Sequence, residues 1–172
     1  MSALAAEVPS IATGRLALLG TGTVGTAFVQ RYQALQARGL TLPGVQWLAN
    51  SRTALAIDRD LAVPLELARR APRDGQGAPR WAGTEGLERG DVVVDATASE
   101  EVAARHVQWL ARGVHVVTAN KLGRGAQLAR AQAIAHSCAD SGARYGDSAT
   151  VGAGLPLLSS LRALAAGGDH IH

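Results

Sequence analysis

The chain has 172 residues, of which 47% are hydrophobic and 18% charged, so a folded domain is expected and extensive disorder is not. The net charge is +3, but acids are interleaved with the arginines and only 3% of residues are aromatic, which argues against nucleic-acid binding. The single cysteine, Cys138, rules out an intramolecular disulfide and fits a reducing, cytoplasmic compartment. No apolar run reaches the length of about 18 residues that a transmembrane helix needs, so no membrane partner is expected.

Strand and helix signals alternate along the chain after a loose lead-in at residues 1–14. Apolar runs typical of strands stand at residues 15–20, 45–49, 91–97 and 114–118. Apolar residues at helical spacing stand at residues 23–38 and 99–112. Three of the expected strands lack in/out alternation, which is typical of strands covered on both faces. The expected fold class is therefore α/β, a Rossmann-type doubly wound parallel sheet with helices on both faces.

The first chemical motif is GTGTVG at residues 20–25, between the first expected strand and the first expected helix. Gly20 allows a tight turn, Gly22 lets a pyrophosphate approach the backbone, and Gly25 lets helix and strand pack closely. The phosphates of a dinucleotide would then lie at the positive end of the helix. We expect the whole motif to bind the cofactor, through Gly20, Thr21, Gly22, Thr23, Val24 and Gly25. The alternative is a glycine-rich turn that binds nothing.

The end of the second expected strand should contact the ribose of the cofactor. This strand runs into Asn50, Ser51 and Arg52, with no acidic residue before Asp58. An acid at this point would bind the 2′-hydroxyl of NAD, whereas an arginine suits the 2′-phosphate of NADP. We therefore expect Ser51 and Arg52 at the cofactor and favour NADP, with NAD as the alternative. The alternative for Arg52 is one more exposed arginine in an arginine-rich chain.

The third and fourth expected strands end in polar residues that would border the same crevice. Thr97, Ala98 and Ser99 follow the third strand, although Ser99 equally fits the N-cap of the next helix. Asn120 and Lys121 follow the fourth, and Lys121 is the only lysine among the 17 basic residues. A lysine can polarise a carbonyl oxygen and transfer a proton, which arginine cannot, so Lys121 is the candidate catalytic residue. The alternative is a capping or salt-bridging lysine.

Two other residues with reactive side chains fit structural roles better. Cys138 stands near the expected end of a helix and should pack at the edge of a core rather than act as a nucleophile. His106 shares one side of its helix with Val102, Trp109 and Leu110, so it should be a packed or half-exposed residue rather than a ligand.

Four motifs follow one another in the chain: LLGTGTVGTAF at 18–28, VVVDATAS at 92–99, VHVVTANKLG at 114–123 and YGDSATVGAGLPLLSSLRALAAGGDHI at 145–171. Together they resemble homoserine dehydrogenase, and the TVGAGLP core of the last motif is the most specific. The resemblance implies NAD(P)H-dependent interconversion of L-aspartate 4-semialdehyde and L-homoserine, in threonine and methionine biosynthesis. It also matches Lys121 to a lysine held to lie beside the nicotinamide and the substrate.

The resemblance further implies a monovalent-cation site, with sodium as the usual ion. The family binds this ion largely through backbone carbonyls, which by position are those of Val151, Ala153 and Leu155. Many members have a glutamate where this chain has Ser148, so that ligand departs from the family pattern.

The expected organisation is an NAD(P)-binding domain over 15–148, followed by a cation-site loop and linker helix over 149–172. In the family, this helix leads into a second domain that supplies the dimer sheet, the acids that grip the substrate and a second catalytic lysine. A homodimer is therefore expected at full length, and this chain alone should bind cofactor without normal turnover of homoserine. The alternatives are a non-catalytic dinucleotide-binding module and another Rossmann amino-acid dehydrogenase.

Overall fold

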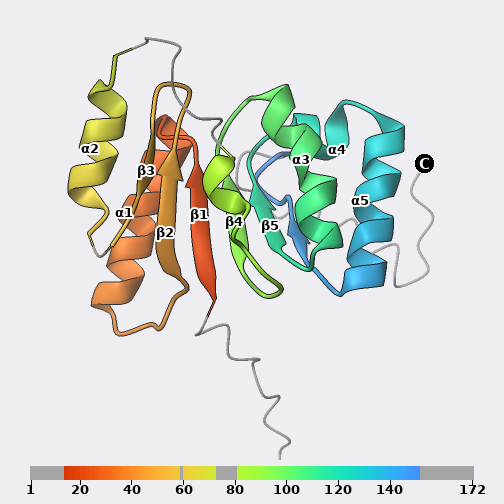
Figure 1. Cartoon of the computed structure of the whole chain (residues 1–172), viewed down its shortest axis with the longest axis horizontal. Helices are drawn as coiled ribbons and strands as arrows, with labels where there is room; N and C mark the ends of the chain where they lie inside the picture. Colours follow the sequence, from red (N-terminus) through yellow and green to blue (C-terminus); the bar gives the residue numbers. More distant parts are fainter. Residues whose placement is uncertain (1–13, 59, 73–80, 152–172) are drawn as a thin grey trace, which may run out of the picture.

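The structure is a computed structural model, and it describes residues 14–58, 60–72 and 81–151. Its centre is a six-stranded sheet in the order β3-β2-β1-β4-β5-β6 (Figure 1). The strands are β1 (Arg15–Leu19), β2 (Gly44–Ala49), β3 (Ala54–Ala56), β4 (Val92–Asp95), β5 (His115–Thr118) and β6 (Tyr145–Gly146). Neighbouring strands are parallel except β2 and β3. The expected parallel sheet is confirmed, with an antiparallel edge strand that the sequence did not indicate.

Helices cover both faces of this sheet. They are α1 (Thr23–Ala37), α2 (Ala62–Arg70), α3 (Glu100–Ala111), α4 (Leu122–Gly125) and α5 (Leu128–Ser141), with a 3-10 turn at Ala82–Thr84. Figure 1 shows α1 and α2 on one side of the strands and α3, α4 and α5 on the other. This layering is the doubly wound arrangement that the sequence predicts.

Each face of the sheet buries its own core. Leu16 and Leu18 of β1 pack toward α1 and α2, whereas Ala17 and Leu19 pack toward α3 and α5. All four are at most 4% exposed, which explains why this run has apolar residues at every position. Cys138 packs, half-buried, against the second core as expected, and burial raises the pKa of its thiol.

The order of the strands reverses between β1 and β4. The chain passes from β1 to β2 on one side and reaches β4 on the other, so both strands end at the same edge. Backbone hydrogen bonds join the segments beyond the strands: Gly20 N donates to Ala49 O at 2.7 Å, and Ala96 N donates to Leu19 O at 2.8 Å. In open α/β sheets, ligands bind outside the carboxyl ends of strands at such a switch point.

Several short elements carry no strong sequence signal. β3 has only three residues, and β6 only two. α2 contains Pro64, which a helix tolerates only in its first turn, and α4 has four residues of which two are glycine. The expected lead-in before Gly14 and the linker helix at 154–168 lie outside the described residues, so the proposed domain boundaries stay predictions.

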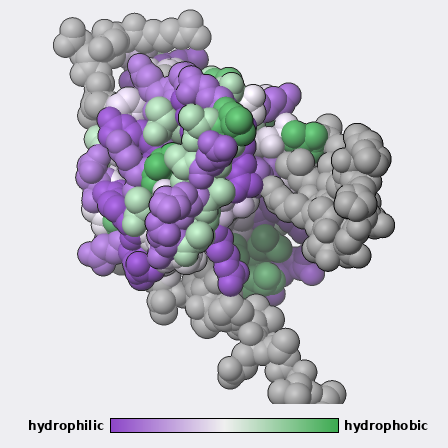
Figure 2. Space-filling view, turned by 90° about the vertical axis from the view of Figure 1, so that its right-hand side faces the viewer, coloured by the Kyte–Doolittle hydropathy of each residue, from purple (hydrophilic) through white to green (hydrophobic). Residues whose placement is uncertain are grey.

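The side of the molecule that carries α5 presents mainly hydrophilic residues, with apolar ones scattered between them (Figure 2). Leu128 at the start of α5 is 75% exposed, whereas Ile134 in its middle is fully buried. Among the described residues, no helix is long and apolar enough to cross a membrane.

Candidate cofactor site

The turn between β1 and α1 requires glycine at two positions. Gly20 has a φ of +105°, and a Cβ added there would lie 2.6 Å from the carbonyl oxygen of Ala96. A Cβ added at Gly25 would lie 1.9 Å from the carbonyl oxygen of Gly20. The tight turn and the close contact between helix and strand are therefore both present.

Gly22 differs from these two glycines because it faces open space. A Cβ added at Gly22 would meet no atom within 4 Å. Gly22 is the N-cap of α1, no side chain caps the helix there, and no acidic residue stands in its first turn. The first N–H groups of α1 thus remain available for an anion at the positive end of the helix.

A cavity of about 840 Å³ opens at these strand ends, within the size range of small-molecule sites. Its lining comes from the turn after β1, from α1, from the segments after β2 and β4, and from α2. The lining residues are Gly20, Thr21, Gly22, Thr23, Thr26, Ala27, Gln30, Asn50, Ser51, Arg52, Arg69, Ala96, Thr97 and Ala98. Among the described residues, two arginines and no acidic residue belong to this lining, so the cavity favours an anion.

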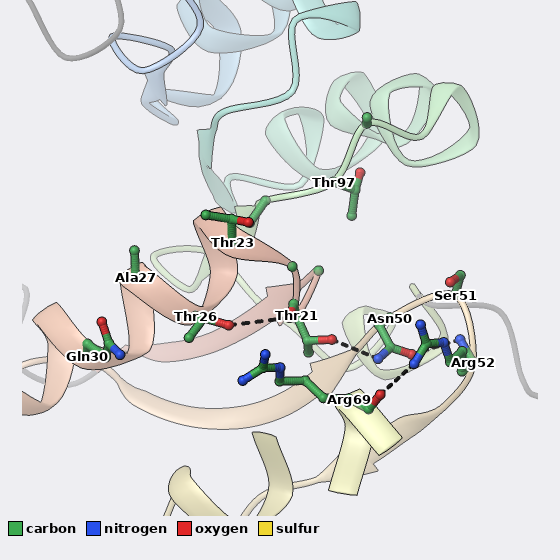
Figure 3. A pocket seen from close by; sticks show the side chains of 14 residues that line it. Thr21, Thr23, Thr26, Ala27, Gln30, Asn50, Ser51, Arg52, Arg69 and Thr97 are labelled. Atoms are coloured by element: carbon green, nitrogen blue, oxygen red, sulfur yellow. Dashed lines mark hydrogen bonds between the residues drawn. The ribbon is translucent and has the colours of Figure 1, made fainter. Parts of the chain in front are cut away.

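Asn50 organises the rim of the cavity (Figure 3). Its Nδ2 donates to Thr21 Oγ1 at 2.7 Å and to Ala68 O at 2.6 Å, while its Oδ1 accepts from the backbone N–H of Arg52 at 2.7 Å. The Arg52 guanidinium donates to the carbonyl oxygen of Arg69. These bonds join the ends of β1, β2 and α2 and bring Arg52 and Arg69 to one rim.

Of the residues that the sequence predicts at the cofactor, some line the cavity and others lie around it. Eight of them line it, namely Gly20, Thr21, Gly22, Thr23, Ser51, Arg52, Thr97 and Ala98. Val24 is 50% exposed on α1, and Gly25 packs against the turn. Ser99 is the N-cap of α3, where its Oγ accepts from Val102 N at 3.4 Å, so the capping role is confirmed. Contact of these residues with a cofactor stays a prediction.

Asn120 and Lys121 lie beyond the end of β5 and do not line the cavity. Asn120 is 1% exposed, and its side chain makes hydrogen bonds inside the domain. Lys121 is exposed at the N-cap of α4, and its side chain takes part in no hydrogen bond or ion pair with the described residues. The capping or salt-bridging alternative for its side chain thus has no support there, while its catalytic role stays a prediction.

Sequence reasoning missed six lining residues: Thr26, Ala27, Gln30, Asn50, Arg69 and Ala96. Thr23, Thr26 and Gln30 share one face of α1 at helical spacing, so this signal was available in the sequence. Arg69 carries no such signal, because α2 itself was not expected.

The predicted cation ligands fall at the edge of the described chain. Val151 is 44% exposed, and it follows a turn in which Thr150 N donates to Asp147 O at 3.0 Å. Ala153 and Leu155 lie outside the described residues. Within the described residues, no group of three or more His, Cys, Asp or Glu side chains is placed to hold a metal ion.

The switch-point crevice, the glycine turn and the uncapped end of α1 define a dinucleotide-binding domain. The sequence profile described as "Homoserine dehydrogenase, NAD binding domain" matches residues 20–145. The chain belongs to this family, which confirms the resemblance seen in its motifs and makes its ligand a nicotinamide cofactor.

Individual relatives agree with this family. The chain is 42% identical over 80 residues to a chloroplastic bifunctional aspartokinase/homoserine dehydrogenase of Arabidopsis thaliana, covering 46% of this chain and 9% of that protein. It is similar to the crystal structure of a putative homoserine dehydrogenase from Archaeoglobus fulgidus, with a TM-score of 0.70 and 25% identity over 89% of this chain and 48% of that one. A mutant hyperthermophilic archaeal homoserine dehydrogenase, solved in complex with NADPH, shares the fold at a TM-score of 0.72 and 21% identity, over 90% of this chain and 50% of that one. The chain thus spans about half the length of these solved neighbours and a smaller share of the plant protein.

Proposed function

We propose that the cavity binds NADP(H), with the pyrophosphate at the N-terminus of α1 and the 2′-phosphate at the arginine rim. The main support for this proposal is the charge of the residues that line the cavity. Arg52 and Arg69 are the charged side chains among the described residues of the cavity, and none of these residues offers a carboxylate for the 2′-hydroxyl of NAD. Backbone N–H groups of the turn from Gly20 to Gly25 would hold the pyrophosphate, while Thr97, Ala98 and Ser99 would border the cofactor.

We further propose that the intact protein interconverts L-aspartate 4-semialdehyde and L-homoserine, on the strength of its family membership. When bound, NADPH supplies a hydride for the aldehyde carbon. Lys121 would donate a hydrogen bond to the aldehyde oxygen and transfer a proton to it, which completes the alcohol of homoserine. An exposed lysine without an ion-pair partner among the described residues is free to turn toward a substrate.

Three finer assignments belong to the same proposal. A sodium ion held by the carbonyls of Val151, Ala153 and Leu155 and a homodimer at full length are supported by the family resemblance. A cytoplasmic location is supported by Cys138, which has no second cysteine within these 172 residues to pair with.

The activity is tested on the protein purified from its native source. We expect NADPH absorbance at 340 nm to fall when L-aspartate 4-semialdehyde is added, and to rise when L-homoserine is added to the oxidised cofactor. Glutamate and alanine serve as control substrates, because an amino-acid dehydrogenase specific for either of them would oxidise it in place of homoserine. Tight NADPH binding without any turnover of the semialdehyde would favour the alternative of a non-catalytic dinucleotide-binding module.

A further inference from the structure

The end of β4 carries a buried carboxylate that the cofactor site does not use. Asp95 is completely buried. Its Oδ1 accepts from Thr97 N at 2.9 Å and from Thr97 Oγ1 at 2.7 Å, while its Oδ2 lies 2.9 Å from His106 Nε2 and 3.0 Å from Asn120 Nδ2. Four hydrogen-bond donors therefore converge on one carboxyl group, and no arginine or lysine of the described residues pairs with it.

His106 extends this network toward α4. It is completely buried and hydrogen-bonded, which confirms that it packs inside the domain. Its Nδ1 lies 3.0 Å from Tyr145 Oη. Burial, followed by the charge of Asp147, raises the pKa of Tyr145, so the phenol stays protonated and can donate a hydrogen bond to Nδ1 of a neutral imidazole. Nε2 then carries the ring hydrogen and donates to Asp95, which makes one directed chain of hydrogen bonds.

Asn120 joins the network to the backbone around Lys121. Its Nδ2 donates to Asp95 and also to the carbonyl oxygen of Ser99 at 2.9 Å, which fixes the orientation of the amide. Its Oδ1 must then accept, and it does so from Leu122 N at 3.1 Å. The backbone on both sides of Lys121 is thus tied to the buried carboxylate.

Helix α4 lies directly on the other end of the network. A Cβ added at Gly123 would be 2.1 Å from Tyr145 Oη and 3.0 Å from His106 Nδ1. Only glycine permits this approach, so the first turn after Lys121 rests on the hydrogen bond between His106 and Tyr145. The segment that carries Lys121 is therefore held by Asn120 on one side and by His106 with Tyr145 on the other. Asp95 joins the two sides, because it is hydrogen-bonded to both Asn120 and His106.

We propose that Asp95, His106 and Tyr145 form a positioning relay that fixes Lys121 relative to the cofactor, with His106 as its central positioning residue. The relay affects catalysis only if Lys121 lies beside the nicotinamide half of the cofactor, so the inference rests on the proposed function. If His106 only filled space in the core, loss of the Tyr145 hydroxyl would not change how the Lys121 amine responds to the cofactor.

Because Lys121 is the only lysine, its methylated amine gives the only lysine signal in the 172-residue chain, beside the signal of the N-terminal amine. Reductive methylation with ¹³C-formaldehyde gives one lysine NMR signal, which the Lys121→Arg variant identifies by its absence. In the unsubstituted chain we expect NADPH to shift this signal and adenosine 2′,5′-bisphosphate, which lacks the nicotinamide half, to leave it in place.

The test compares Tyr145→Phe and His106→Phe with the control His136→Gln, because His136 is 79% exposed on α5. In both relay variants we expect the NADPH-induced shift of the Lys121 signal to fall by about half or more, while the dissociation constant for the bisphosphate changes less than about twofold. The control should behave like the unsubstituted chain. Tyr145→Phe keeps the ring and carries the test if His106→Phe does not fold.

Three results would overturn the inference, and each has a different cause that the experiment can distinguish. An unchanged NADPH response in both folded relay variants would show that His106 only packs. Binding of NADPH without any shift of the Lys121 signal in the unsubstituted chain would place Lys121 away from the nicotinamide. Failure of both NADPH and the bisphosphate to bind would refute the proposed cofactor site itself, together with the relay.

Discussion

Gly25→Ala should destabilise the domain by about 3 kcal/mol or more, the upper end of typical overpacking costs. The added Cβ would lie 1.9 Å from the carbonyl oxygen of Gly20, and neither backbone segment can yield easily because Gly20 already has a φ of +105°. For a domain of this size, that loss lowers the melting temperature by about 6–12 °C. Thermal unfolding followed by circular dichroism measures the change.

Gly22→Ala provides the matched control for this substitution. Its Cβ meets nothing within 4 Å, and its φ of −73° suits alanine, so it should cost about 1 kcal/mol at most. The same methyl group would stand where the pyrophosphate approaches, so NADPH affinity should fall about tenfold or more although the fold is kept. Equal melting temperatures for Gly25→Ala and Gly22→Ala would contradict the packing account.

Arg69→Ala should weaken NADPH binding by about tenfold to a hundredfold and leave NADH binding nearly unchanged. A hydrogen bond to a charged group contributes about 1.5–3 kcal/mol, and each 1.4 kcal/mol is about tenfold in affinity. Arg52→Ala should have a similar effect, because its guanidinium lies at the same rim. Isothermal titration of each variant with both cofactors gives the two affinities.

Arg70→Ala is the matched control, since Arg70 neighbours Arg69 on α2, is 83% exposed and does not line the cavity. Arg69 and Arg70 both pair with Glu66, so removing either one has a comparable effect on the surface charge of α2. A loss of NADPH affinity in Arg70→Ala as large as in Arg69→Ala would mean that general charge, rather than a phosphate contact, is responsible.

Much of the fold could be predicted because its strands are buried on both faces. Strands such as β1 and β4 show uninterrupted apolar runs, and the glycine motif between β1 and α1 marks the turn. β3 could not be predicted in the same way, because three residues of weak strand propensity form it only by pairing with β2. Its antiparallel direction likewise depends on how it pairs with β2 and not on its own residues.

In the candidate site, too, some residues follow from local sequence signals and others only from tertiary packing. The residues of the glycine turn could be predicted, because the local backbone geometry of the turn requires glycines at fixed positions and the sequence motif shows them. Arg69 reaches the cavity only because α2 packs beside β2 and because Asn50 binds the carbonyl oxygen of Ala68. The relay from Asp95 to Tyr145 likewise joins residues that lie 50 positions apart in the sequence and meet only in the folded sheet.

Titration of the unsubstituted chain with NADPH and with NADH tests the central claim most directly. We predict one binding site, with NADPH bound about tenfold more tightly than NADH or better, because the described residues that line the cavity include two arginines and no carboxylate. Tighter binding of NADH, or no binding of either cofactor, would contradict the account.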